Sequence, residues 1–280
     1  MSRKTKSRLF VGAMMGCLAV SFGTLAWLLG TTLVDGLPAL SKALFTDPPS
    51  TQADEAGARP AILATIYLAA LLLLMAVPIG VLTAIYLEEY ARKERWYNRL
   101  LELNIQNLAA VPAIVYGILG LAFVVRGPVG IGRVLLAGAI ILTLVVLPTV
   151  IIASREAIRS VPDSIRQGGY ALGATKWQVV SRQVLPASIP GIATGSILAL
   201  SRAVGETAPL LLIGALQYVA FDPTVLGAFT ALPVQIYTWV KLPDPAFQNL
   251  AAAAIIVLLV IVLAMNAIAI FLRNRYRQTW

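Results

Sequence analysis

Six long apolar segments, separated by charged or proline-rich stretches, constrain this chain more than any other feature of its sequence. They lie at 9–34, 61–87, 104–125, 134–153, 189–216 and 249–272. A helix needs about 20 residues to cross the hydrocarbon core of a bilayer, and each segment reaches that length. Lipid cannot satisfy open backbone groups, which favours helical over non-helical spans. The sequence therefore predicts an all-α, polytopic membrane protein with six transmembrane helices.

Composition supports this class and removes others. Only 12% of the 280 residues are charged, whereas soluble domains carry about 25%. The chain has one cysteine, Cys17, and no histidine. An intrachain disulfide, an imidazole metal site and a Ser/His/Asp triad are therefore all excluded.

The basic residues predict the orientation of the chain. Sixteen of them fall on one side of the six segments: Arg3, Lys4, Lys6, Arg8, Arg92, Lys93, Arg95, Arg99, Arg155, Arg159, Arg166, Lys176, Arg182, Arg273, Arg275 and Arg277. The opposite side holds five. Because Lys and Arg accumulate in cytoplasmic loops, we expect both termini in the cytoplasm. The net charge of +9 then reflects orientation and requires no nucleic-acid partner.

This topology divides the chain into two parts. Residues 1–60 are expected to form a basic tail, an uncleaved first transmembrane helix and a periplasmic loop. Residues 61–280 are expected to form the main transmembrane domain, with a cytoplasmic loop at 155–188. The proline- and aromatic-rich connection 217–248 can hold a short re-entrant or interfacial helix. The Gly12-xxx-Gly16 and Gly191-xxx-Gly195 motifs predict close helix packing within the chain.

The cytoplasmic connection 156–186 reads EAIRSVPDSIRQGGYALGATKWQVVSRQVLP. Pro162 and Asp163 mark a helix start, and Gly173 breaks the helix after about Leu172 because glycine tolerates a sharp bend. A second short helix is expected from about 176 to 184, ended by Pro186. Two short helices of this kind can insert into a groove of a partner protein. The alternative is an amphipathic helix lying in the headgroup layer.

Charged residues at the ends of two segments allow further interpretations. Glu88 and Glu89 belong to a mixed-charge run that predicts a solvated face, with contact to a partner as the alternative. Arg155 and Arg159 lie at the end of the fourth segment, where they set topology or attract an anion.

An arginine and a glutamate lie inside the fifth apolar segment, in SRAVGETAPLLLIGA. Arg202 and Glu206 are four residues apart, so they share one face of a helix. Each costs about 2.5–3.5 kcal/mol near the bilayer centre, so both should face the bundle interior or a water-filled path. One interpretation is a clamp between helices. The other is an anion site, because the planar donors of arginine match phosphate or sulfate; Arg202, Glu206 and Thr207 would then line the path.

No phosphate-binding loop is present. The nearest match, Gly168-xxxx-Gly173, is followed by Thr175 at the hydroxyl position, but Ala174 stands where the lysine that reaches the phosphates is needed. We expect no cofactor on this chain, so any ATP hydrolysis must come from a separate subunit.

The cytoplasmic connection resembles the coupling loop of ABC-importer permeases, whose pattern is E-A-A, three residues, Gly, nine residues, I-x-L-P. Gly173, Leu185 and Pro186 occupy the matching positions, whereas 167–169 read Gln-Gly-Gly. The resemblance implies that this loop docks on an ATPase. The docking residues would be Ala171, Leu172, Gly173, Ala174, Thr175 and Lys176.

The stretches RAVGETAPLLL (202–212) and NLAAVPAIVYGILG (107–120) resemble the PstA-type permeases of the phosphate-specific ABC importer. This resemblance implies a MetI-like architecture in the bacterial inner membrane and inward phosphate transport. The implied partners are a PstC-type permease, a PstB-type ATPase dimer and a periplasmic phosphate-binding protein. The alternatives are the sister permease subunit, a sulfate or molybdate permease, a secondary anion transporter and a non-transporting assembly factor.

Overall fold

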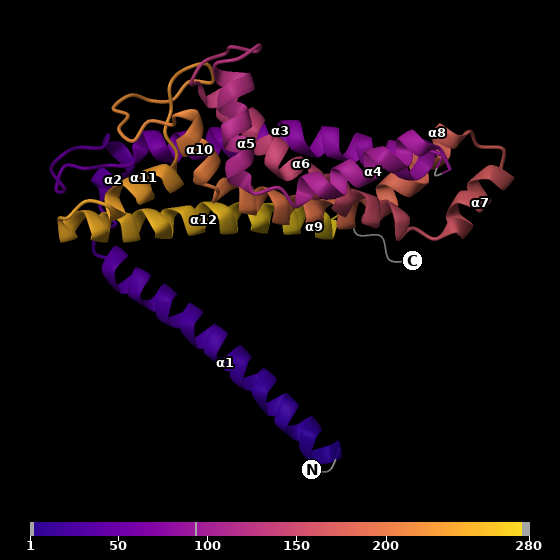
Figure 1. Ribbon diagram of the computed structural model, residues 1–280, viewed down its shortest axis with the longest axis horizontal. Coiled ribbons are helices and arrows are strands. Elements are labelled where there is room, and N and C mark those ends of the chain that lie inside the picture. The colour runs from indigo at the N-terminus through magenta and orange to yellow at the C-terminus, as the bar shows by residue number, and fades with distance from the viewer. Residues whose placement is uncertain (1–2, 93, 276–280) are drawn as a thin grey trace.

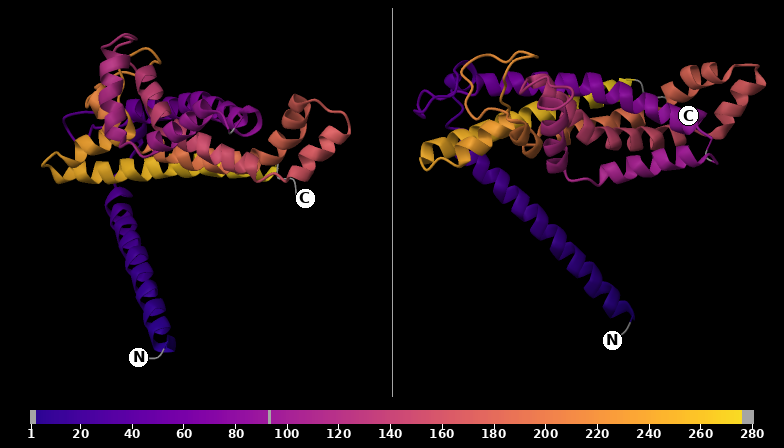
Figure 2. Two further views of the ribbon diagram at one scale, coloured as in Figure 1. Left: turned by 45° about the vertical axis from the view of Figure 1, so that its right-hand side comes forward. Right: turned by 45° about the horizontal axis from the view of Figure 1, so that its top comes forward.

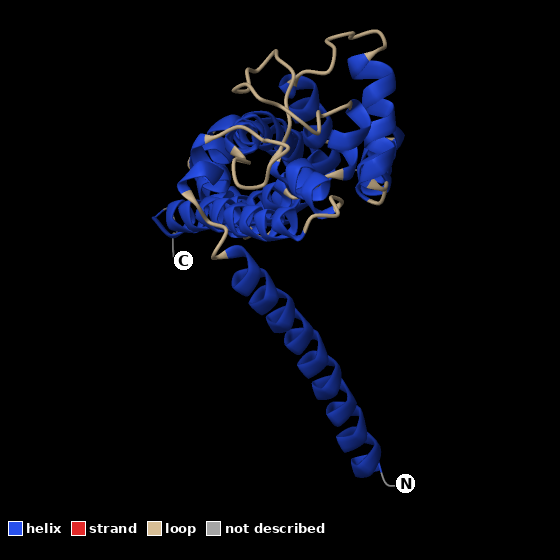
Figure 3. Ribbon diagram, turned by 90° about the vertical axis from the view of Figure 1, so that its left-hand side faces the viewer, coloured by secondary structure: helices blue, strands red, loops and turns tan. Residues whose placement is uncertain are grey.

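The computed structural model of this chain describes residues 3–92 and 94–275. Within those ranges the protein consists of helices and loops without a strand (Figure 3). Five of the described helices are long and apolar enough to cross a membrane, or six if one bent pair counts as a single span. The predicted all-α membrane fold is therefore confirmed. Lys93 and Arg277, two of the basic residues used to predict orientation, lie outside the described residues.

The elements run in chain order as α1 (Arg3–Gly36), α2 (Lys42–Thr46), α3 (Arg59–Ile85), η1 (Tyr86–Tyr90), α4 (Trp96–Ala109), α5 (Ala113–Gly120), η2 (Leu121–Val125), α6 (Leu135–Arg159), α7 (Asp163–Ala171), α8 (Lys176–Val179), η3 (Val180–Val184), α9 (Leu185–Val204), α10 (Ala208–Ile213), α11 (Leu232–Val240) and α12 (Pro245–Arg275). The three η elements are π-helical turns. The loop end with α7 and α8 lies opposite the end with α2, α10 and α11 (Figure 1).

Helix α6 is the centre of the bundle and packs against α3 on one side and α9 on the other. Leu135, Ile141 and Val150 of α6 are fully buried. Small residues allow α9 to pack close to α6. A Cβ added at Gly191 would lie 2.7 Å from the Cβ of Ala157, and one added at Gly195 would lie 2.3 Å from the Cβ of Ala153. The Gly191-xxx-Gly195 prediction of close packing within the chain is therefore confirmed.

Helix α1 leaves the bundle at an angle (Figures 1 and 2). It contacts α12 near its end, where Gly36 packs against the backbone of Ala252. Along the rest of α1, large apolar side chains such as Phe22 and Trp27 are exposed. A Cβ at Gly12 or Gly16 would meet no atom within 4 Å, so the predicted packing of this motif within the chain is wrong.

The third apolar segment is bent. Its two halves, Trp96–Ala109 and Ala113–Val125, meet at 103° instead of forming one continuous helix over 104–125. Pro112 explains the bend, because proline lacks an N–H and disfavours helical geometry in the residue before it.

The fifth span is displaced from its predicted position. The membrane-length helix covers Lys176–Val204, whereas the sequence predicted 189–216. Pro186 does not end the second short helix of the connection 156–186, since α8, η3 and α9 are continuous. This proline is the second residue of α9, in the first turn after the π-helical turn η3, where the α-helical hydrogen-bond register changes and a residue without an N–H fits.

The connection 217–248 contains the short helix that its sequence allowed. Helix α11 packs against α12 and α3, with Leu232 and Trp239 buried. The Oγ1 atom of Thr65 on α3 accepts a hydrogen bond of 2.9 Å from the N–H of Leu232. This segment is therefore an integral part of the bundle.

Candidate functional site

Arg202 and Glu206 flank a break between two helices. Helix α9 ends at Val204, and α10 begins only at Ala208. The prediction that both residues lie on one uninterrupted helix is therefore wrong, because the chain bends at Gly205. The pair itself forms, with Arg202 Nε 3.6 Å from Glu206 Oε1.

The exposure of Arg202 limits what it can face. Its side chain is 80% exposed, and its only ion-pair partner among the described residues is Glu206. A charged group at membrane depth is costly against lipid and normally faces protein or a water-filled cavity. A clamp between helices of this chain does not account for an arginine with this exposure. The anion-site interpretation of Arg202, Glu206 and Thr207 stays a prediction.

Helix α5 holds the break in place. A Cβ at Gly117 of α5 would lie 2.8 Å from the Cα of Pro209, the second residue of α10. The hydroxyl of Tyr116 donates to the carbonyl of Leu108 across the bend between α4 and α5. The stretch 107–120, which the sequence linked to the same family as 202–212, thus packs directly on that segment.

The connection 156–186 has the predicted helix–glycine–helix form. Helix α7 ends at Ala171, and Gly173 adopts φ +78°. Helix α8 begins with a capping box, in which Thr175 and Gln178 each accept a hydrogen bond from the other's backbone N–H. This reciprocal cap fixes the start of the second helix.

The tip of this loop is exposed and partly apolar. Leu172 is 87% exposed, and Tyr170 and Trp177 on either side are also exposed. Large exposed apolar side chains grouped in this way mark an interaction site. The predicted docking residues 171–176 all lie at this tip. The Lys176 ammonium, however, also lies 4.9 Å from the ring centroid of Tyr90 on η1.

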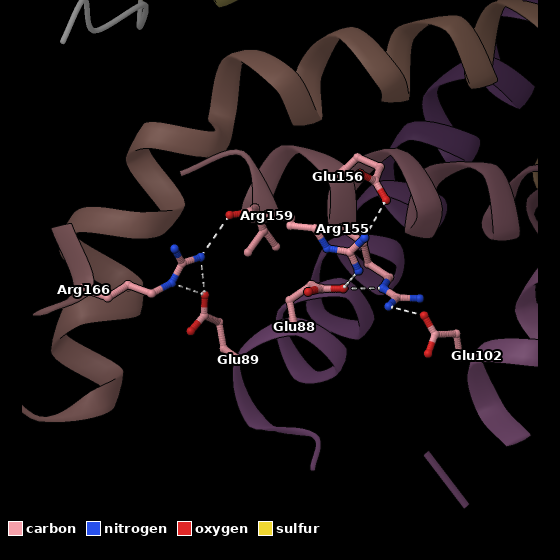
Figure 4. A network of polar contacts seen from close by, with 8 residues as sticks. Glu88, Glu89, Glu102, Arg155, Glu156, Arg159 and Arg166 are labelled. Atoms are coloured by element: carbon pink, nitrogen blue, oxygen red, sulfur yellow. Dashed lines mark hydrogen bonds and ion pairs between the residues drawn. The ribbon is translucent and has the colours of Figure 1, made fainter. Parts of the chain in front are cut away.

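An ionic network with a buried centre joins η1, α4, α6 and α7 (Figure 4). Glu88 Oε1 accepts hydrogen bonds of 2.8 Å from Arg155 and from Arg159 of α6. Arg155 also donates to Glu102 of α4 at 2.6 Å. Glu89 accepts two hydrogen bonds from Arg166 of α7.

Sequence reasoning missed this network. It placed Glu88 and Glu89 on a solvated face, but their side chains are only 6% and 7% exposed. A role in setting membrane topology does not explain why Arg155 is buried and forms ion pairs with two glutamates. The available signal was opposite charge at the adjacent ends of two spans, Glu88 and Glu89 after the second and Arg155 and Arg159 after the fourth.

No cluster of three or more His, Cys, Asp or Glu residues that could hold a metal occurs among the described residues. The charged groups of the candidate site are thus an Arg–Glu pair at the end of α9 and an Arg–Glu network at the end of α6.

Comparison with known proteins agrees with this geometry. Residues 76–278 match the family of binding-protein-dependent transport system inner membrane components. The phosphate transport system permease protein PstA of Yersinia pestis is 33% identical over 279 residues, covering 98% of this chain and 92% of that protein. PstA 1 of Mycobacterium tuberculosis (strain H37Rv) is 34% identical over 218 residues, covering 78% and 70%.

Solved structures show the same fold. A permease chain of a bacterial alginate ABC transporter, in complex with an alginate pentasaccharide-bound periplasmic protein, superposes with a TM-score of 0.67 at 20% identity. The match covers 99% of this chain and 98% of that one. The chain therefore belongs to the family of binding-protein-dependent transport system inner membrane components and, within it, to the PstA group of phosphate transport system permeases.

Proposed function

We propose that this chain is one permease subunit of an ATP-driven importer of inorganic phosphate in the bacterial inner membrane. The observation that carries the proposal is the Arg202–Glu206 pair at a helix break, with the arginine open to the outside of this chain. The names of the similar permeases support phosphate as the substrate.

Both termini and the loop with α7 and α8 are proposed to be cytoplasmic. The strong excess of Lys and Arg on this side supports that orientation. So does the direction of α12, whose C-terminal end points toward the side of the bundle that holds α7 and α8 (Figure 1).

The pair gives a physical route to phosphate recognition. The Arg202 guanidinium offers planar donors to an oxyanion, and Thr207 adds a hydroxyl nearby in sequence. Glu206 positions Arg202 and lowers its affinity for the anion enough to permit release. A carboxylate can also accept a hydrogen bond from a protonated phosphate, which sulfate does not offer at neutral pH.

The remaining parts of the transporter come from other chains. A paralogous PstC-type permease supplies the other half of the path, and its surface faces Arg202. Two PstB-type ATPases carry ATP and Mg²⁺, and one of them docks on the exposed tip 171–176 of this chain, where Leu172 provides the apolar contact. A periplasmic phosphate-binding protein delivers the substrate.

Transport by the reconstituted complex tests the proposal. Liposomes are loaded with ATP or left without it, and uptake of phosphate, sulfate and molybdate is measured. We expect ATP-dependent phosphate uptake that Arg202→Gln and Glu206→Gln each reduce. Arg59→Gln serves as the control, because Arg59 forms an exposed pair with Asp222 away from the helix break.

Each alternative gives a different result. Uptake without ATP indicates a secondary transporter, and uptake of sulfate or molybdate in preference to phosphate indicates a permease for another oxyanion. Wild-type phosphate uptake in both the Arg202 and Glu206 variants overturns the role of the pair.

A further inference from the structure

The last three residues of the π-helical turn η1 each contact a different element of the cytoplasmic end. Glu88 pairs with two arginines of α6. Glu89 pairs with Arg166 of α7. Tyr90 lies under the ammonium of Lys176, the first residue of α8. Because η1 continues α3 without a break, a transmembrane helix is joined here to both helices of the loop.

Arg166 is the strongest of these connections. Its Nε and Nη2 atoms donate to Glu89 Oε1 at 3.1 and 2.9 Å. Its Nη1 atom donates to the carbonyl of Val161 at 2.6 Å, and Nη2 also donates to the carbonyl of Ile158 at 3.0 Å. One side chain therefore ties α7 to the end of α3 and to the last turn of α6.

The burial of this pair distinguishes it from an ordinary surface ion pair. The Glu89 side chain is 7% exposed and that of Arg166 is 16% exposed. Arg166 also contacts Asp163 at 3.2 Å, but that carboxylate is 85% exposed, and exposed pairs contribute little. Removing Glu89 or Arg166 leaves a buried charge without its partner, whereas removing Asp163 does not.

We propose that Glu89 and Arg166 form a rigid link that carries movement of the tip 171–176 into α3 and α6. Glu88 extends the link to α6, and Tyr90 extends it to α8. Glu89 and Arg166 are positioning residues, since neither is placed on the substrate path. The role as a transmission element rests on the proposed function, because the tip must be moved by an ATPase.

The coupling ratio of the complete complex gives the first test. Phosphate uptake per ATP hydrolysed is measured for Glu89→Gln, Arg166→Gln and the double variant, using only preparations in which the complex co-purifies. We expect each single change to lower the ratio at least about fivefold, the lower end of typical coupling between sites. The double variant should lose no more than either single one, because the two residues act as one unit.

Asp163→Asn is the matched control, since it removes the exposed partner of the same arginine, and it should keep the wild-type ratio. Arg166→Lys keeps the charge and should recover part of the ratio. Wild-type ratios in both single variants, or losses that multiply in the double variant, overturn the proposal.

A distance measurement tests rigidity independently of the transported substrate. Spin labels are placed at Ser164 of α7 and Leu82 of α3, both exposed, after Cys17→Ser removes the single cysteine of the chain. We expect the same distance with and without ATP in this background, and a distance that shifts with ATP after Arg166→Gln. An equal shift in both overturns the rigid link even if phosphate uptake is normal. If the distance between the labels is the same with and without ATP but the complex imports no phosphate, the proposed function is contradicted and the rigid link is not.

Discussion

Gly195 of α9 and Ala153 of α6 sit so close that a Cβ at position 195 would lie 2.3 Å from the alanine Cβ. One turn away, Gly191 makes the same contact with Ala157 at 2.7 Å. Two small-residue rows therefore face each other, which lets the backbones of α6 and α9 approach. This crossing positions α9, the helix that leads from the loop with α7 and α8 to Arg202.

The first prediction concerns this contact. Gly195→Ala inserts a methyl group into a filled space and should destabilise the fold by about 1–3 kcal/mol, the usual effect of overpacking. Unfolding of the purified chain in detergent, followed by circular dichroism, measures the change.

A second-site substitution serves as the control for the crossing. Ala153→Gly in the Gly195→Ala background removes the clashing atom, and the next contact lies at 3.5 Å, which is ordinary van der Waals distance. The double variant should recover most of the loss. If it is as unstable as Gly195→Ala alone, the contact does not explain the effect.

The second prediction concerns the hydrogen bond between Thr65 and Leu232. Thr65→Val keeps the shape but leaves the buried N–H of Leu232 without its 2.9 Å acceptor. An unsatisfied buried donor costs about 1–3 kcal/mol, so α11 should detach from α3 more readily. Hydrogen exchange of the residues in α11 measures this local opening. Thr65→Ser retains the hydroxyl and should protect α11 almost as well as threonine; equal protection in the valine variant contradicts the prediction.

The third prediction compares two arginines that differ in burial. Arg155→Met removes a buried guanidinium from Glu88 and Glu102. We expect a loss of about 3 kcal/mol, the lower end for a broken buried pair, because Arg159 still neutralises Glu88. Arg59→Met breaks an exposed pair with Asp222 and should change stability by less than about 1 kcal/mol.

Denaturant unfolding of both variants under one set of conditions gives this comparison. Equal effects of the two substitutions would show that burial does not control the strength of these pairs. A larger effect of Arg59→Met would reverse the expected order and would assign the stability to the opposite end of the bundle.

Hydropathy predicted where apolar helices occur but not where they stop. The run 189–216 reads as one span because Gly205 is tolerated inside an apolar window, yet the chain breaks there and the span begins earlier, at Lys176. The bend in the third segment had a visible cause, Pro112, but its angle depends on packing of α5 against Pro209. Local residues therefore suggest a break, and tertiary contacts decide its geometry.

The same difference between local residues and tertiary contacts decides which features around the candidate site could be predicted. The helix–glycine–helix loop depends on local capping and on one glycine, so its sequence pattern was sufficient. The pairing of Glu89 with Arg166 joins residues 77 positions apart, and no local pattern encodes which charges will meet. Such a pair becomes visible only when α3 and α7 are placed together.

The last prediction concerns Gly173, whose φ of +78° lies in the left-handed region. A Cβ added there would meet no atom within 4 Å, so a substitution acts through backbone strain alone. Gly173→Ala should cost about 1–2 kcal/mol, and Gly173→Asn less, because asparagine adopts this conformation more readily. Gly168 is the control: it is helical with equally open surroundings, and Gly168→Ala should stabilise the chain by about 0.4–1 kcal/mol.

Thermal unfolding of the isolated chain ranks the stabilities of the Gly173 variants and of the Gly168→Ala control. Co-purification of the ATPase reports whether the tip keeps its shape. We expect Gly173→Val to retain less ATPase than Gly173→Asn, because valine is β-branched and opposes a positive φ most strongly. If valine, alanine and asparagine at position 173 all behave like glycine in both measurements, the left-handed bend is not what shapes the docking tip. The role of the tip would then rest on the exposed apolar side chain of Leu172, and Leu172→Asp should abolish co-purification on its own.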